Sequence, residues 1–183
     1  MSVTRPSIAM DQLFVGYLQN PAPENFLALR TALLEAPGFD PYSRDLSQAE
    51  TLFASEHFRE AEQELRQRMR PSHILSAGAH LKLALVYERL GQNEEMERER
   101  AIAIRCIEGI LSTGDGSMER PYQVTRPSDE YDVLAASNLT WASQTLRQAG
   151  GRRIDVIQTK EGSEVCFDVS EVMDILKRRL QSG

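Results

Sequence analysis

Apolar residues recur at helical spacing through residues 1–112 of this chain, and helix breakers separate the recurrences. Spacings of three and four residues place such side chains on one face of a helix. Proline and glycine between the apolar segments, as at Pro71 and Gly91, interrupt the pattern. The sequence therefore predicts six helices, over 10–18, 24–36, 46–53, 55–70, 73–90 and 93–111, with Ser55 as the N-cap of the fourth.

Short alternating segments follow the helical part, near 122–124, 154–159 and 165–169. Alternation of apolar and polar residues is typical of strands with one buried face. The glycine pair at 150–151 predicts the turn of a hairpin. The segment 138–150 fits either a continuing helix or a strand, so its structure stays open at this point.

Two further helices are expected in this second part, after Ser128 and after Ser170, because serine is a favoured N-cap residue. The chain is thus predicted to be α+β, with helical hairpins followed by a small antiparallel sheet and one or two helices. We expect a helical lobe over 1–112 and a mixed lobe over 113–183, packed as one unit.

The helical part resembles tetratricopeptide-like repeats. Small and aromatic packing residues of that repeat are matched by Leu83, Ala84, Tyr87, Gly91 and Ala103. The preceding helix pair keeps Leu52, Ala61 and Leu65 but lacks the glycine. The resemblance implies stacked helical hairpins and a concave face that binds a partner.

Five short motifs occur in a fixed order along the chain. They are Phe26–Arg30 (Phe-x-x-x-Arg), Pro41-Tyr42, Gly114-Asp115-Gly116, Asp129-Glu130-Tyr131 and Phe167-Asp168-Val169-Ser170. Together they resemble an uncharacterised bacterial family known only as a domain of unknown function, over roughly residues 20 to 172. The resemblance implies the layout of helices followed by a sheet. It implies no activity, cofactor or catalytic residue.

The charge of the chain argues against two classes of partner. The net charge is −6, and neither part of the chain carries the basic surface that nucleic acids or anionic membranes require. No apolar run approaches the ~20 residues that span a bilayer, and the first residues lack the apolar core of a secretory signal. We therefore expect a cytoplasmic protein with a protein partner, one that is basic if charge guides the pairing.

The residues that usually hold metals are too scattered to predict a site. Cys106 and Cys166 lie far apart in sequence and are expected to be buried as small apolar side chains. His73 and His80 are seven residues apart, and neither has a third ligand nearby in sequence. We expect no metal and no cofactor.

A hydrolase or ligand-binding enzyme is one of two functional hypotheses. Its candidate residues are Asp155, Asp168, Asp115 and Tyr131, since paired carboxylates at a seam between helices and sheet perform acid and base catalysis. The structural alternatives are a solvated or turn-forming role for the aspartates and a place in the core for Tyr131. Asp129 and Glu130 suit the first turn of a helix.

The leading hypothesis is a non-enzymatic protein-interaction module, such as an adaptor, a chaperone or an antitoxin-like or immunity-like partner. It rests on the helical hairpins, the acidic balance and the lack of a catalytic motif. Candidate partner-binding residues are Trp141, Tyr42 and Tyr87, because aromatic side chains dominate interfaces. Trp141 has an alternative role, as an anchor of the second core with Tyr131 and Phe167.

Overall fold

Helices form most of the structure, a computed structural model that describes residues 5–43 and 45–182. The chain order is α1 (Arg5–Gln19), α2 (Pro23–Leu34), α3 (Ser47–Ala54), α4 (Phe58–Arg68), the π-helical turn η1 (Met69–His73), α5 (Ala77–Arg89), α6 (Asn93–Leu111), β1 (Tyr122–Gln123), α7 (Ser128–Ala136), β2 (Trp141–Ala149), β3 (Arg152–Thr159), β4 (Glu164–Asp168) and α8 (Ser170–Ser182). The predicted α+β class is confirmed.

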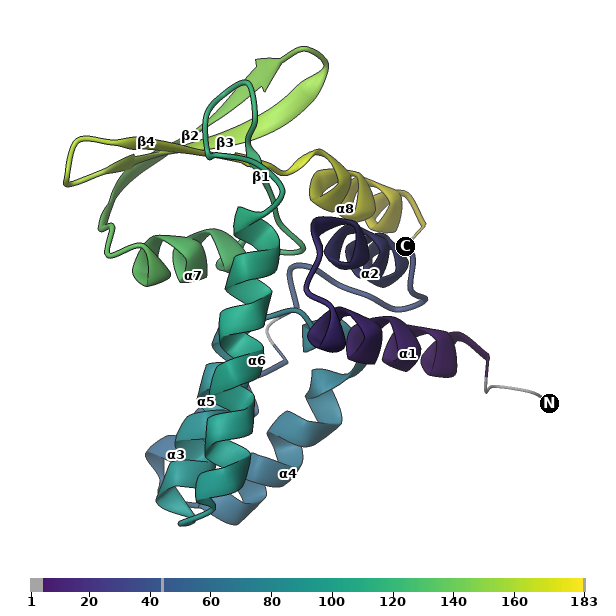
Figure 1. The fold of residues 1–183 in the computed structure, drawn as a ribbon, viewed down its shortest axis with the longest axis vertical. Coiled ribbons are helices and arrows are strands. Elements are labelled where there is room, and N and C mark those ends of the chain that lie inside the picture. The colour runs from purple at the N-terminus through teal and green to yellow at the C-terminus, as the bar shows by residue number, and fades with distance from the viewer. Residues whose placement is uncertain (1–4, 44, 183) are drawn as a thin grey trace.

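Two helical hairpins, α3–α4 and α5–α6, stand below the sheet in Figure 1. Ser76 begins α5, and its side chain accepts a hydrogen bond from the backbone N–H of Ala79 at 3.3 Å. Gly91, with φ of +71°, follows the last residues of α5 and allows the chain to reverse into α6. Caps and breakers thus set the hairpin that the sequence predicts most clearly.

The sheet has the strand order β1-β4-β3-β2. The β3 strand pairs antiparallel with both β2 and β4, and the two-residue β1 pairs parallel with β4. Gly150 and Gly151 form the β2–β3 turn, with φ of +58° and +78°, which a type I′ hairpin requires. The predicted hairpin is confirmed, and the segment left open before it is the strand β2.

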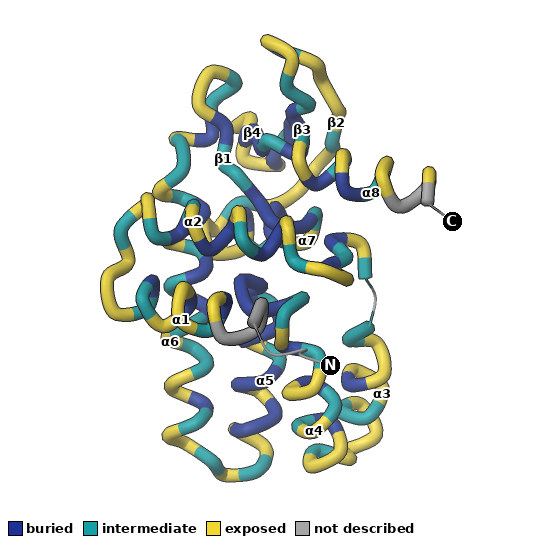
Figure 2. Tube along the Cα trace, turned by 90° about the vertical axis from the view of Figure 1, so that its right-hand side faces the viewer, coloured by how far each residue is buried: buried dark blue, intermediate teal, exposed yellow. Residues whose placement is uncertain are grey.

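One hydrophobic cluster crosses the boundary at residue 112. It joins Phe26 of α2, Ile110 of α6, Phe167 of β4 and Val172 of α8. A second cluster, which includes Leu65 and is formed by α3 to α6, fills the hairpins. Buried residues therefore gather where the helices meet under the sheet, as Figure 2 shows, while the outer turns of the hairpins and most of β2 are exposed.

Four details of the sequence prediction are wrong. Ser128 is the first residue of α7 rather than its N-cap, because Pro127 occupies the cap position and no side chain caps the helix there. Ser55 ends α3 rather than beginning α4, which starts at Phe58 after His57. The helix expected from His73 begins only at Ala77, because the π-helical turn and Ser76 intervene. The motif Gly114-Asp115-Gly116 after a helix predicts a left-handed C-cap at Gly114, but it is Gly116 that takes this conformation, with φ of +77°.

Gly114 is required for a different reason, the close approach of two backbone segments. A Cβ atom at this position would lie 2.3 Å from the carbonyl oxygen of Arg120. The loop after α6 therefore folds back on itself before β1 begins.

Among the described residues, no helix is long and apolar enough to cross a membrane, and no group of three metal-binding side chains comes together.

Candidate functional site

Asp155 and Tyr131, two of the candidate catalytic residues, meet around the side chain of Gln144. The amide Nε2 of Gln144 donates to Oδ2 of Asp155 at 2.9 Å, and the Tyr131 hydroxyl donates to Oε1 of Gln144 at 2.9 Å. In the β2–β3 register Gln144 lies opposite Ile157, two residues from Asp155 on the same face of the sheet. This face of the sheet is the one that covers α7 (Figure 1).

Glu130 of α7 is the fourth member of this cluster, which we call the carboxyl network (Glu130, Tyr131, Gln144 and Asp155). Its side chain has no exposed surface, and its Oε2 accepts a second hydrogen bond from Gln144 Nε2 at 3.0 Å. Burial raises the pKa of Glu130 to about 9, helped by the negative charges of Asp155 and Asp129. Glu130 is therefore a neutral carboxylic acid at neutral pH.

Tyr42 lies at the margin of the carboxyl network. Burial raises the pKa of its phenol, and the negative charges of Asp155 and Glu130 raise it further. The turn at Asp40 directs the chain here, since Oδ1 of Asp40 accepts a hydrogen bond from the Tyr42 backbone N–H at 3.0 Å. The turn after α2 thus contributes a half-exposed phenol beside a buried acid.

The carboxyl network has the groups for acid and base chemistry, but its geometry favours a structural role. Glu130 is fully buried, and both Asp155 and Tyr131 already use Gln144 as a partner. A substrate would have to displace these hydrogen bonds before it reached the acid. The network fastens α7 to β2 and β3, and in that position it orders the seam between helices and sheet.

The other two candidate aspartates lie away from this network. Asp168 pairs with Ile154 across β3 and β4, whereas Asp155 pairs with Phe167, so the two carboxylates point to opposite faces of the sheet. Asp168 accepts a hydrogen bond from the backbone N–H of Ser170 at 3.0 Å and caps α8. Asp115 is exposed and accepts one from the backbone N–H of Ser117 at 3.0 Å.

The three candidate partner-binding residues differ in exposure. Trp141 and Tyr42 are 45% and 40% exposed, whereas Tyr87 is buried among the helices of the hairpins. We also considered that Trp141, Tyr131 and Phe167 anchor a second core. This alternative is wrong for Trp141 and Tyr131. Both are about half exposed, and only Phe167 is fully buried.

A buried polar cluster holds the start of α7. Oδ2 of Asp129 accepts hydrogen bonds from the Thr125 backbone N–H at 2.8 Å, from the Thr125 hydroxyl at 2.6 Å and from the Arg126 backbone N–H at 3.1 Å. Burial raises the pKa of Asp129 to about 6. Arg126 donates to the carbonyl oxygen of Ser72, and burial with the nearby Arg126 charge lowers the pKa of His73 to about 4. These contacts join α7 to the π-helical turn.

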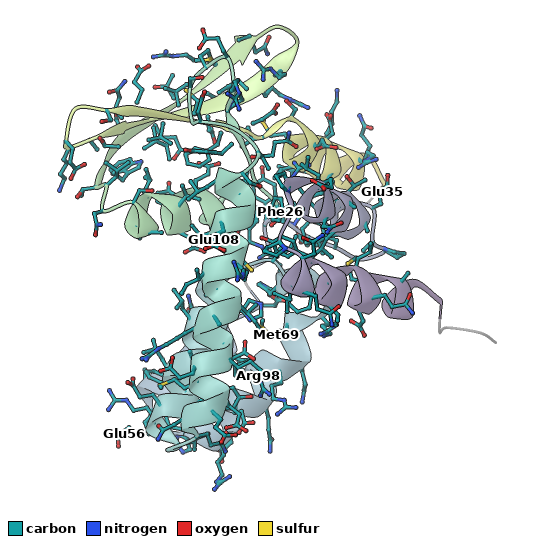
Figure 3. All side chains as sticks on the ribbon, in the orientation of Figure 1. Phe26, Glu35, Glu56, Met69, Arg98 and Glu108 are labelled. Atoms are coloured by element: carbon teal, nitrogen blue, oxygen red, sulfur yellow. The ribbon has the colours of Figure 1, made fainter. Side chains whose placement is uncertain are left out.

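An apolar groove of about 510 Å³ lies between α5, α6 and α7; we call it the α5–α7 groove. Leu81 and Ile104 are 46% and 58% exposed in it. Its apolar walls also contain Ala103, Ile107, Ala135 and Ala136. The lining also includes Ala77 and two acidic residues, Glu108 and Asp132, and no basic side chain of the described residues belongs to it. Figure 3 labels Glu108 on α6 near α7.

Sequence reasoning missed this groove because it treats Leu81 and Leu85 as part of one apolar pattern over the predicted helix 73–90, together with Tyr87. Ala77, Leu81 and Leu85 follow one another at intervals of four and form a second apolar face of α5. The main core uses the opposite face, with Leu83 and Tyr87 buried. This second apolar face was the signal in the sequence that part of the α5 surface is apolar but does not pack into the main core.

These features define the protein as an α+β protein in which helical hairpins carry a small mixed sheet. The chain belongs to a family described as a domain of unknown function (DUF4919), whose family model matches residues 79–178. The matched range runs from α5 into α8, so the segments 26–30 and 41–42 lie outside it. No curated protein and no solved structure matches the chain.

Proposed function

We propose that this protein is a non-enzymatic interaction module that binds a helix of a partner protein in the α5–α7 groove. The observation that carries the proposal is the exposure of Leu81 and Ile104 within one concave apolar surface. A groove of this kind accepts an amphipathic helix through apolar side chains three and four residues apart. Roles as an adaptor, a chaperone or an antitoxin-like partner all use such a contact.

The acidic residues beside the α5–α7 groove indicate the charge of the partner helix. Glu108 and Asp132 flank the apolar walls, and the chain as a whole has a net charge of −6. One oxygen of Glu108 pairs with Arg105 at 2.6 Å, and one oxygen of Asp132 accepts a hydrogen bond from the Gly78 backbone N–H at 2.8 Å, so each carboxylate has its second oxygen for a partner. A helix with lysine or arginine beside its apolar face would pair with these carboxylates, whereas an acidic helix would be repelled. The partner we infer is therefore a basic amphipathic helix.

Replacing Ile104 by aspartate is expected to abolish this binding. When an apolar helix docks, a charged side chain in the groove must lose its hydration water. The free energy of this desolvation exceeds the favourable free energy of the apolar contact. We would measure the affinity of a labelled helical peptide of leucine and lysine, and of a matched peptide of leucine and glutamate, by fluorescence anisotropy. The basic peptide should bind at least tenfold more tightly, and Ile104→Asp should weaken it at least tenfold.

Leu146→Asp is the matched control for this experiment. Leu146 is 47% exposed, as Leu81 is at 46%, but it lies on β2 outside the groove. Its substitution should leave peptide binding unchanged. Equal affinity for both peptides, or equal losses in the two aspartate variants, would contradict the proposal. Dimers of the wild type that Ile104→Asp converts to monomers would identify a second copy of the chain as the occupant instead.

The second candidate is a small hydrolase, and one feature of the carboxyl network supports it. A neutral Glu130 beside Asp155 is the arrangement in which one acid donates a proton and the other accepts one. Chromogenic esters, phosphates and glycosides would serve as substrates. Turnover by the wild type that Glu130→Gln removes, without loss of stability, would support this candidate over the interaction module.

A further inference from the structure

A second concave surface, which we call the arginine pocket, lies between α1, α4, α5 and α6. Its volume is about 370 Å³, within the usual range for small-molecule sites. Arg66, Arg70 and Arg98 all line it, although the chain as a whole is acidic. Figure 3 labels Arg98 and Met69, both lining residues, on the side of α6 that faces α4.

The three guanidinium groups retain free hydrogen-bond donors. Arg66 pairs with Glu62 on its own helix at 3.3 Å and also hydrogen-bonds to the Tyr87 side chain. Arg70 pairs with Asp11 of α1. Each pair uses one nitrogen of a group that carries several N–H donors. Arg98 has no hydrogen-bond or ion-pair partner within the part of the chain that the structure describes.

The acidic side chain of the pocket is already engaged. Glu99 is its one acidic lining residue among those described, and its Oε2 lies 2.6 Å from Nδ1 of His80. The other ring nitrogen of His80 lies 3.1 Å from the carbonyl oxygen of Ile74. Glu99 therefore does not pair with the arginines, and Arg98 keeps a positive charge that no described acidic side chain neutralises.

The floor of the pocket is apolar and aromatic. The ring of Phe14 stacks on His80 with centroids 6.3 Å apart and an angle of 9°, and the guanidinium of Arg70 lies 5.5 Å from the Phe14 centroid. Leu83 and Ile102 contribute aliphatic surface beside these rings. Phe14 and Leu83 are themselves 5% and 3% exposed. A flat apolar group would therefore lie against the half-buried Ile102 and the Arg70 guanidinium that covers Phe14, while an attached anion reached the arginines.

We propose that the arginine pocket binds a small organic anion with a flat apolar body. Its phosphate or carboxylate group would accept hydrogen bonds from Arg66, Arg70 and Arg98, which suit planar, multidentate recognition of anionic oxygens. Its apolar body would lie against Ile102 and the Arg70 guanidinium that covers Phe14. This site is separate from the α5–α7 groove and independent of the function proposed for that groove.

Calorimetric titration of the full chain tests the proposal with four probes. They are 1-naphthyl phosphate, 1-naphthoate, neutral 1-naphthol and inorganic phosphate. We expect at least one naphthyl anion to bind about tenfold more tightly than either 1-naphthol or inorganic phosphate. The tighter of the two naphthyl anions identifies the anionic group. Naphthyl anions that bind no better than 1-naphthol would overturn the role of the arginines.

Substitutions locate the binding. Arg98→Ala and Arg66→Ala should each weaken the tighter anion about tenfold, since each removes charged hydrogen bonds. Both side chains are exposed, so thermal unfolding should remain close to that of the wild type. Arg89→Ala, at an exposed arginine outside the pocket, should bind as the wild type does.

Unchanged affinity in both Arg98→Ala and Arg66→Ala would overturn the proposal. Ile104→Asp separates the two sites, because it should abolish helix binding in the groove and leave anion binding intact. Loss of anion binding in Ile104→Asp would place the probe in the α5–α7 groove and would also overturn the proposal.

Discussion

Replacing Glu130 by glutamine will flatten the dependence of folding stability on pH between about pH 6.5 and 8. Glu130 has a pKa of about 9 in the folded protein and 4.5 in the unfolded chain. The folded state therefore holds a proton that the unfolded state releases, and the free energy of unfolding falls as pH rises toward 9. The slope from this group approaches about 1.4 kcal/mol per pH unit.

The difference between the two proteins isolates this effect. Asp129, with a pKa of about 6, and His73, with a pKa of about 4 against 6.5 when unfolded, also titrate near this range. Both groups are present in both proteins, so their contributions cancel in the difference. Glutamine cannot ionise, yet its carbonyl oxygen still accepts the hydrogen bond from Gln144. The stability of Glu130→Gln relative to the wild type should therefore rise by about 2 kcal/mol from pH 6.5 to pH 8.

Urea unfolding at several pH values across this range, followed by circular dichroism, measures the difference. Glu35→Gln is the control, because Glu35 is exposed at the end of α2 and its substitution should retain the slope of the wild type. A wild-type slope in Glu130→Gln would show that the buried acid is ionised in the folded protein.

Substitution of Gly109 by alanine should lower stability by about 2 kcal/mol, despite the better helix propensity of alanine. Gly109 lies inside α6, where a Cβ atom would be 2.2 Å from Cδ2 of Phe26 and 2.7 Å from the Tyr17 hydroxyl. Both rings are buried, and the Tyr17 hydroxyl donates to the carbonyl oxygen of Arg105 at 2.5 Å. The α2 helix would have to move away from α6.

Gly16→Ala provides the matched comparison. Gly16 lies inside α1 with no atom within 4 Å of the added Cβ, so alanine should raise stability by up to about 1 kcal/mol. Thermal unfolding of both variants should show opposite shifts in Tm, with the decrease for Gly109→Ala near 4–8 °C, as an order of magnitude. A Gly109→Ala variant as stable as Gly16→Ala would argue against tight packing of α2 on α6.

The order of helices could be predicted from the sequence because their apolar spacing and their breakers are local signals. The hairpin at Gly150–Gly151 was predictable for the same reason, since its turn type demands glycine. The residues that cap the helices were harder to predict. Ser55 has the side chain of an N-cap, but it lies two residues before His57, the cap position of α4, and ends the preceding helix.

The carboxyl network could not be predicted, because it depends on which face of α7 meets the sheet. Glu130 and Tyr131 are adjacent, and a helix turns them in different directions. Local preference favoured an exposed acid and a buried tyrosine, but the structure buries Glu130 and leaves Tyr131 46% exposed. The pairing of Glu130 with Gln144 arises only from the packing of α7 against β2.

Arg30 of α2 links the first part of the chain to the last helix, α8. This contact can form only late during synthesis of the chain. Arg30 is buried, and it donates to the carbonyl oxygen of Val124 and pairs with Glu171, which is 141 residues further along the chain. At typical ribosomal rates, roughly 10–30 s pass between the incorporation of Arg30 and that of Glu171. Until then α2 lacks α8, so the nascent chain carries an open apolar face that closes only when translation is nearly over.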